Sequence, residues 1–428
     1  MNKTISAFLT LLIFIAAAFT FAGCNNNKNS DSSKPDKKTY TVQQDKYLFG
    51  IDNLTSDMQP AQIDGKTTNA WSAEVIGELG AKSHRIWIYL GFFIKRDNKN
   101  DLTLNRANCE VLRDYIKNLS DNGVERFVGM TCNFINPYEF NASNSTTVPS
   151  VYENYDVYVK FLDIMENAYK MLAAEFPEIK FWEVSNEPDI SHGSWFHKKD
   201  NTKFSAEEGS FIVADLCYRA NRAVKSVSAD NKTVLPGLTD DSAAVNYLDK
   251  IYGHIESGYL PTGEDYADKN TDNYFDYLAW HPYPSLASTT ENFVKQEKAM
   301  YEVVKNHGDD GKPVFYTEIG FSDFRFGGSK DSENGLDDTQ KRVAEFAVKC
   351  LNAIKTELPF VETAFWFRLT NISQFYTEGS IENSFGLFYS PNDIAERAGK
   401  PKPIAISIYK FFNGENADTS VLYKHLKG

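Results

Sequence analysis

Two glutamates of this sequence stand where carboxyl groups often do chemistry, directly after short apolar runs. Glu187 lies in the segment FWEVSNEPDI, and Glu318 lies in KPVFYTEIGFSD. Of two neighbouring carboxyl groups, one can donate a proton while the other, ionised, attacks or stabilises a reacting centre. This division of work requires a fold that brings these two distant positions together.

Five further residues with polar or aromatic side chains lie within or shortly after apolar runs. They are Arg85 in HRIWIYL, Asn186 beside Glu187, His281 and Tyr283 in YLAWHPYPS, and Trp366 in AFWFRLTN. A guanidinium keeps a neighbouring carboxylate ionised, and amide, imidazole and phenol groups orient a substrate or a carboxylate. The alternative for His281 is a core histidine bonded to the backbone, and the alternative for Trp366 is ordinary barrel packing.

The elements that must position these residues follow from the hydrophobic pattern. From about residue 46 the chain alternates short apolar runs with longer segments of helical periodicity, which is typical of a parallel sheet. The eight runs span residues 47–51, 83–88, 126–131, 180–184, 233–238, 277–280, 313–317 and 363–367. Eight strands with intervening helices predict a single-domain α/β structure, a (β/α)8 TIM barrel over residues 46–428 with enlarged loops at 133–150 and 240–275. In such barrels the chemistry lies at the carboxyl ends of the strands, so all seven residues are expected on one rim.

The spacing of apolar residues also predicts individual helices. Residues 158–172 and 343–354 carry apolar side chains every three or four positions. A capping box formed by Ser205 and Glu208 predicts the start of another helix, which runs through Cys217.

The order of three motifs resembles a known group of enzymes. The motifs are NEP at residues 186–188, HPY at 281–283 and TE-x-G at 317–320, each after a predicted strand. They look like signatures of clan A retaining glycoside hydrolases, and the closing segments GLFYSP and KPKPIAISIYKFF are similar to families 5 and 39 of that clan. The resemblance covers residues 47–412. The third run departs from it, because CNFINP contains no histidine for the site.

The resemblance implies a role for each residue. Glu187 would be the acid/base and Glu318 the nucleophile, with carboxyl groups about 5–5.5 Å apart, against about 6.5–9.5 Å in inverting enzymes. Arg85 would keep the nucleophile ionised. The other expected contacts are a hydrogen bond from Asn186 to the sugar 2-hydroxyl, orientation of the nucleophile or sugar by His281 and Tyr283, stacking of the sugar on Trp366, and a leaving-group subsite at His192, Trp195, Phe196 and His197.

The N-terminus reads as an export signal. Lys3 precedes an apolar run that ends in FAGC, which resembles a bacterial lipobox with Cys24 as the lipidated residue. Residues 1–23 are therefore expected to be a signal peptide, and residues 24–45 a polar, lipidated tether that attaches the protein to a bacterial membrane on its extracytoplasmic side. The alternatives are an uncleaved membrane anchor, or secretion with an incidental cysteine.

Composition limits the partners and cofactors. The net charge of -13 disfavours nucleic acid as a partner. The seven histidines show no HxxxH or HExxH spacing, so no metal is expected, and no cofactor is needed. The remaining cysteines, of which three lie in apolar patterns, are expected to be unpaired; they are Cys109, Cys132, Cys217 and Cys350.

The sequence as a whole predicts a monomeric retaining β-glycoside hydrolase that acts on a polysaccharide or oligosaccharide outside the cytoplasm. Two alternatives stay open. One is a non-catalytic carbohydrate-binding lipoprotein, which the aromatic content of 14% would suit. The other is a transglycosylase on the same barrel, which would use the same two glutamates.

Overall fold

The structure is a computed structural model. It describes residues 39–53, 62–63, 66–97, 99–135, 146–190, 196–239, 242–258, 269–323, 333–372, 384–391, 393 and 397–424. Within these ranges, no helix combines the length and the apolar composition needed to cross a membrane. Cys24 and the expected signal peptide lie outside the described residues.

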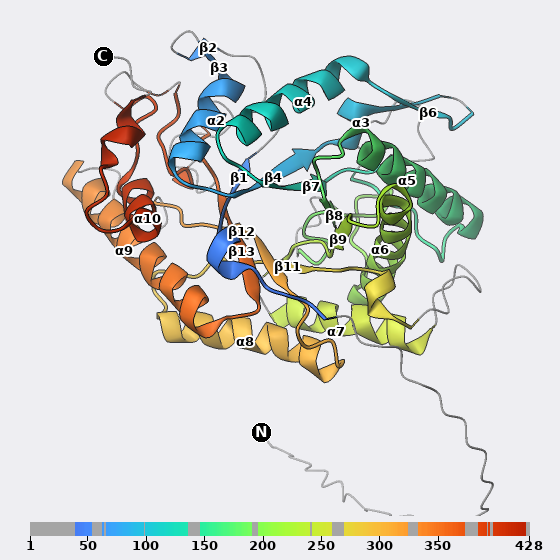
Figure 1. Ribbon diagram of the computed structural model, residues 1–428. Coiled ribbons are helices and arrows are strands. Elements are labelled where there is room, and N and C mark those ends of the chain that lie inside the picture. The colour runs from blue at the N-terminus through green and yellow to red at the C-terminus, as the bar shows by residue number, and fades with distance from the viewer. Residues whose placement is uncertain are drawn as a thin grey trace, which may run out of the picture. The chain divides into compact units, whose positions relative to one another are not determined.

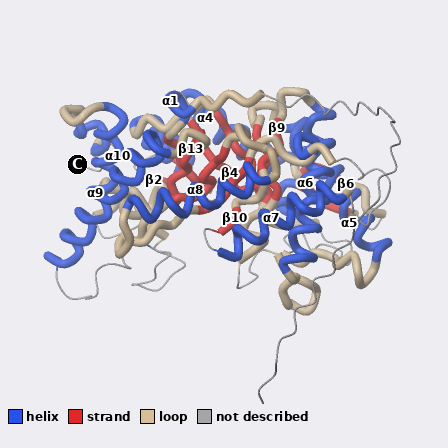
Figure 2. Tube along the Cα trace, turned by 90° about the horizontal axis from the view of Figure 1, so that it is seen from below, coloured by secondary structure: helices blue, strands red, loops and turns tan. Residues whose placement is uncertain are grey.

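Parallel strands at the centre are surrounded by helices, as Figures 1 and 2 show. The strands are β1 (Phe49–Asn53), β4 (Ser83–Ile88), β7 (Arg126–Thr131), β8 (Phe181–Val184), β9 (Lys232–Val234) with β10 (Leu238–Thr239), β11 (Leu278–His281), β12 (Val314–Ile319) and β13 (Val361–Phe367). The helices that follow them in turn are α2 (Thr68–Glu78), α4 (Arg106–Asp121), α5 (Tyr155–Glu175), α6 (Ala206–Val227), α7 (Ser242–Ser257), α8 (Thr290–Asn306), α9 (Glu333–Glu357) and α10 (Pro403–Asn413). The predicted (β/α)8 barrel is confirmed.

The fifth barrel strand is divided into β9 and β10, and this division lies beside the site. Parallel bridges join Val234 to Tyr277 and Asn186 to Gly237, so the broken strand pairs with both of its neighbours and the ring closes. A Cβ atom on Gly237 would lie 2.0 Å from Nε2 of His281. The sequence predicts one unbroken run here, whereas the close approach of His281 requires glycine.

Alternation along the strands sorts side chains between the barrel interior and the helix layer. The lower interior is apolar and contains Val128, Val234, Ala279, Phe315 and Phe365. Two positions further along their strands, His281 and Thr317 are polar, and Glu183 lies two positions beyond Phe181, which packs against this layer. The intervening residues, such as Trp182 and Trp280, are buried in the main core outside the sheet.

The amino-terminal base of the barrel is covered by α1 (Gln44–Tyr47) and the residues before it. The Gln44 amide donates to the backbone oxygen of Val361 at 2.7 Å, and the Gln43 backbone N–H donates to Glu362 at 2.9 Å. The Arg126 guanidinium lies 3.8 Å from the centre of the Tyr47 ring. Residues 43 and 44, which belong to the predicted tether, therefore bind the barrel in the structure.

The predicted helix signals are present in the structure. The Ser205 side chain accepts a hydrogen bond from the Glu208 backbone N–H and caps α6. The Glu208 carboxylate accepts from Ser150 and pairs with Lys198, so this side chain binds neighbouring segments while the backbone N–H of the same residue serves the cap. The four cysteines of the described chain are free and buried.

Short elements are inserted between the barrel strands and helices. They are the hairpins β2–β3 (Gln62–Ile63, Lys66–Thr67) and β5–β6 (Ile94–Arg96, Leu102–Leu104), the turn α3 (Leu90–Phe93) and the 3-10 turn η3 (Thr271–Asn273), while the 3-10 turn η5 (Thr419–Tyr423) follows the last helix. Of these, α3 directly follows the end of β4 and belongs to the carboxyl-terminal rim.

Candidate active site

Six of the seven predicted site residues meet at the carboxyl ends of the strands. Arg85 comes from β4, Asn186 and Glu187 follow β8, His281 ends β11, Tyr283 follows it, and Glu318 lies on β12. Each side chain contacts at least one of the others, as the following distances show. Trp366 is the exception.

Arg85 is the centre of the arrangement and is fully buried. Its Nε and Nη2 donate to the two oxygens of Glu183 at 2.7 and 2.9 Å. Its Nη1 donates to Glu318 at 2.8 Å and to Asp52 at 3.2 Å. One guanidinium therefore serves three carboxyl groups, and removing it would leave buried charge without compensation.

Glu318 is held in its ionised form. Beyond the Arg85 contact, its Oε2 accepts the Tyr283 hydroxyl at 2.6 Å, and its side chain is only 6% exposed. Burial by itself would raise the pKa of Glu318, but the charges of His281 and Arg85 and the Tyr283 hydrogen bond outweigh it and lower this pKa below the usual value. The group is therefore suited to attack as a carboxylate.

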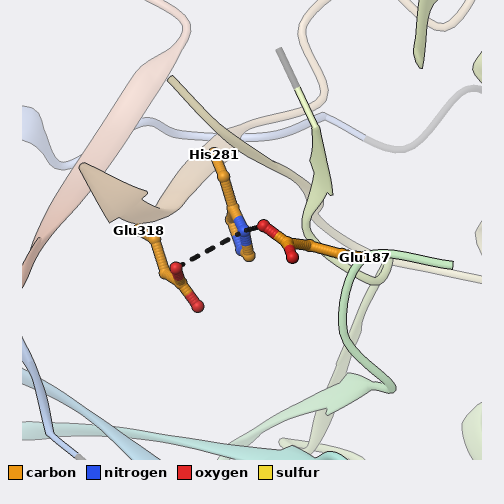
Figure 3. A group of neighbouring side chains, drawn as sticks. All are labelled: Glu187, His281 and Glu318. Carbon is orange, nitrogen blue, oxygen red and sulfur yellow. Dashed lines mark hydrogen bonds and ion pairs between the residues drawn. The ribbon is translucent and has the colours of Figure 1, made fainter. Parts of the chain in front are cut away.

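Glu187 faces Glu318 across the imidazole of His281, as Figure 3 shows. The Nδ1 of His281 lies 2.8 Å from Oε1 of Glu187 and 3.7 Å from Oε2 of Glu318. An oxygen of each glutamate lies within 4.8 Å of the other. Burial opposes a charge on His281, but the two carboxylates outweigh it and raise the pKa of this histidine.

The backbone around Glu187 adopts an unusual conformation. Ser185 and Glu187 have φ of 74° and 42°, in the left-handed region that costs about 1–3 kcal/mol for such residues. A hydrogen bond from the Glu187 N–H to the Gly237 oxygen, 3.0 Å long, holds this turn. Asp189 accepts from both the backbone and the hydroxyl of Thr239, and burial raises the pKa of Asp189 to about 6. The contacts fix the direction in which Glu187 points.

Asn186 is oriented by the same network. Its Oδ1 accepts from Nη2 of Arg85 at 2.8 Å, and the residue is buried. Because its carbonyl oxygen is turned toward Arg85, its NH2 group is turned the other way.

The donor atoms of Glu187, His281 and Glu318 are close enough to bind one cation. Hydrogen bonds within the protein also account for the closeness of these three side chains. His281 Nε2 lies 3.0 Å from the Thr317 hydroxyl, and Glu318 is bonded to Arg85 and Tyr283. Such bonds give each of the three groups a protein partner, so their convergence does not require a metal.

The structure contradicts the predicted stacking role of Trp366. The side chain is fully buried in the core outside the sheet and packs on Phe321 with ring centroids 5.7 Å apart. Since side chains alternate along β13, the next residue, Phe367, is the one that faces the site, where it contacts Tyr283. The predicted strand end is therefore correct, but the aromatic side chain that faces the site there is Phe367 and not Trp366.

The structure describes two residues of the predicted leaving-group subsite, Phe196 and His197, and their contacts do not support this role. Phe196 is buried against Phe134 and Phe204, and His197 bonds to Thr146 and to the Lys198 backbone oxygen. His192 and Trp195 lie outside the described residues, as do large parts of the two long insertions.

Three residues of the site were missed from the sequence: Asp52, Glu183 and Trp87. Trp87 Nε1 donates to Asp52 Oδ1 at 2.7 Å, which ties both to the Arg85 network. The signal was present for Glu183, since a charged residue inside the apolar run FWEV requires a buried partner. Asp52 was missed because the first strand extends two residues beyond the predicted run, to Asn53.

Replacing Asp52 with Asn should change how the stability depends on pH. Burial, only partly offset by Arg85, raises the pKa of Asp52 to about 8. In the unfolded state an aspartate loses its proton near pH 4, whereas folded Asp52 keeps its proton up to about pH 8. Between these two values the free energy of unfolding therefore falls as the pH rises. Between pH 5 and pH 8, the free energy of unfolding measured in urea should therefore fall less in Asp52→Asn than in the wild type. An identical fall in both proteins would show that Asp52 is ionised throughout.

The chain is similar in fold to solved glycoside hydrolases. It aligns with a double mutant of the β-glucosidase from Trichoderma harzianum at TM-score 0.57 and 15% identity, over 88% of this chain and 100% of that one. The GH39 enzyme from Xanthomonas axonopodis pv. citri aligns at TM-score 0.55 and 14% identity, over 88% and 68% of the two chains. A GH5-4 broad specificity endoglucanase from Clostridium acetobutylicum aligns at TM-score 0.55 and 13% identity, over 87% and 99%.

No family model and no curated protein sequence matches the chain. At 13 to 15% identity the structural likenesses establish the barrel fold alone. The reaction therefore has to be argued from the residues of the site.

Proposed function

We propose that the protein is a retaining β-glycoside hydrolase that acts on a polysaccharide or oligosaccharide outside the cytoplasm. The observation that carries the proposal is the approach of Glu187 and Glu318, with an oxygen of each within 4.8 Å, while Glu318 is bonded to Arg85 and Tyr283. This spacing suits the retaining mechanism, whereas inversion needs about 6.5–9.5 Å for a water molecule between the carboxyl groups.

In the first step the Glu318 carboxylate attacks the anomeric carbon. The bond from this carbon to the glycosidic oxygen breaks, and that oxygen takes the proton from Glu187 as the aglycone leaves. The result is a glycosyl ester on Glu318 and an ionised Glu187. In the second step Glu187 removes a proton from water, the water oxygen attacks the anomeric carbon, and the ester bond breaks to restore both glutamates.

The neighbouring groups support these two steps. Arg85 and Tyr283 donate to Glu318, so they stabilise the carboxylate both as the attacking group and as the leaving group of the second step. The NH2 group of Asn186 would donate to the sugar 2-hydroxyl, because its oxygen is already engaged by Arg85. His281 lies between the glutamates and would hold Glu187 in place while its protonation changes.

A stereochemical experiment tests this function. The purified protein is incubated with a panel of β-1,4-glucan, β-1,3-glucan, xylan, mannan and galactan and with the matching 4-nitrophenyl β-glycosides. Proton NMR of the first product should show the β-anomer, which converts to the α-anomer only by mutarotation. An α-anomer as the first product would indicate inversion and exclude Glu318 as the nucleophile.

For the location, we propose lipidation of Cys24 after removal of residues 1–23. The support is the sequence of the signal and the polar segment after it. Cys24→Ala should move the protein from the membrane fraction to the soluble fraction, and metabolic labelling with a palmitate analogue should disappear. Replacing the buried Cys109 by Ala is the matched control and should leave labelling unchanged. Membrane retention of Cys24→Ala would instead support an uncleaved anchor.

A further inference from the structure

Three aromatic side chains form a row that leads from the catalytic centre to the surface. Trp87 begins it, since its ring lies 5.4 Å from the Arg85 guanidinium carbon and its Nε1 donates to Asp52. The ring centroids of Trp87 and Tyr89 are 6.3 Å apart, and those of Tyr89 and Phe92 are 5.6 Å apart. Exposure increases along the row, from buried Trp87 through half-buried Tyr89 to Phe92 at 43%.

The backbone presents Phe92 in a fixed position. The turn α3 buries Leu90 and Phe93 on either side of the exposed ring, and Phe93 packs edge-on against Phe176 at 6.1 Å. The Asn108 amide donates to the Phe92 backbone oxygen at 2.7 Å. The outward direction of Phe92 is therefore set by its buried neighbours.

A single exposed aromatic ring is ordinary on a protein surface, but a row continuous with a catalytic centre is not. The row follows β4 on the rim of the barrel where the site opens. Aromatic rings offer flat apolar faces that match the C–H faces of pyranose rings, and they leave the sugar hydroxyls free to bind water or polar groups. The centroid spacings are comparable with the length of one sugar unit in a chain, so the row suits a linear glycan.

We propose that Trp87, Tyr89 and Phe92 form a glycan-binding track, and that the substrate is a chain of at least three sugars whose units beyond the reacting one lie over Tyr89 and Phe92. This inference rests on the proposed function. It narrows the substrate class from any β-glycoside to oligosaccharides and polysaccharides bound along the rim beyond β4.

Phe92→Ala tests the track, with Tyr423→Ala as the control. Tyr423 is an aromatic residue of nearly equal exposure, 41%, and it lies in η5 near the C-terminus, which is not a loop after a barrel strand. The probes are the polysaccharide of the panel that the wild type cleaves, its disaccharide to hexasaccharide, and the 4-nitrophenyl glycoside of its sugar. For the longer chains, kcat/KM of Phe92→Ala should fall about tenfold, equivalent to about 1.4 kcal/mol. The loss should lie mainly in KM, and the 4-nitrophenyl glycoside should be cleaved at the wild-type rate.

Three outcomes would overturn the track: an equal loss on the 4-nitrophenyl glycoside, no loss at any chain length, or the same loss in Tyr423→Ala. A wild type that cleaves nothing on the panel would instead reject the proposed function. In that case, electrophoresis of Glu318→Gln through gels that contain each polysaccharide tests the track by itself. The track is supported if a polysaccharide retards Glu318→Gln but does not retard the double variant that also carries Phe92→Ala. It is contradicted if the double variant is retarded equally, or if no polysaccharide retards Glu318→Gln.

Discussion

Glu318→Gln should abolish turnover and leave the fold intact. The amide has nearly the same shape and can still accept a hydrogen bond from Arg85 or Tyr283, but it cannot attack the anomeric carbon. Because the nucleophile is required for both chemical steps, kcat should fall by a factor on the order of 10⁴ or more. The measurement is the release of reducing ends from the best polysaccharide of the panel.

A matched control separates this loss from misfolding. Glu302→Gln makes the same chemical change on α8, where the Glu302 side chain is 56% exposed and pairs with Lys305, three residues away. It should retain wild-type activity, because such surface ion pairs contribute little. The far-ultraviolet circular dichroism spectra of both variants should match the wild type. Retained activity in a folded Glu318→Gln protein would show that another group is the nucleophile.

Glu187→Ala should have an effect that depends on the leaving group. A natural sugar leaving group needs a proton, so its release should slow by about 10²–10⁴-fold. A 2,4-dinitrophenyl group leaves without protonation, so formation of the glycosyl ester should be nearly unaffected. The rate of dinitrophenol release in a pre-steady-state burst measures this first step directly.

The second step offers an independent check on Glu187. Without its general base, water attacks the ester slowly, and the ester accumulates. Azide needs no deprotonation, so it should restore steady-state turnover of the dinitrophenyl glycoside and yield the β-glycosyl azide. Equal losses for natural and activated substrates, with no rescue by azide, would count against the acid/base role.

The strands could be predicted from the sequence because buried parallel strands are continuous apolar runs. The predicted ranges 83–88 and 126–131 coincide with β4 and β7. The rule that barrel chemistry lies at the carboxyl ends of the strands then placed Arg85, Glu187 and Glu318 on one rim, and the structure brings these three together. This part of the site depends only on the fold type and the position of each strand end.

The remaining features depend on register and on pairs of residues, which one sequence does not reveal. Trp366 and Phe367 are adjacent and both aromatic, and only the pairing of β13 with its neighbours decides which one faces inward. The break between β9 and β10 reflects the close approach of His281 to Gly237, a contact over 44 residues of sequence (281 minus 237). Asp52 and Glu183 are defined by their shared partner Arg85, from a third strand.

Covalent trapping tests the central claim most directly. The reagent is a 2-deoxy-2-fluoro β-glycoside of the preferred sugar with a 2,4-dinitrophenyl leaving group. The fluorine slows both chemical steps, and the activated leaving group restores the first, so the glycosyl ester accumulates. Mass spectrometry of the digested protein should find one added fluorosugar, on the peptide that contains Glu318, and Glu318→Gln should remain unlabelled. Labelling of a different residue, or turnover of the reagent without any covalent adduct, would contradict the proposed double displacement.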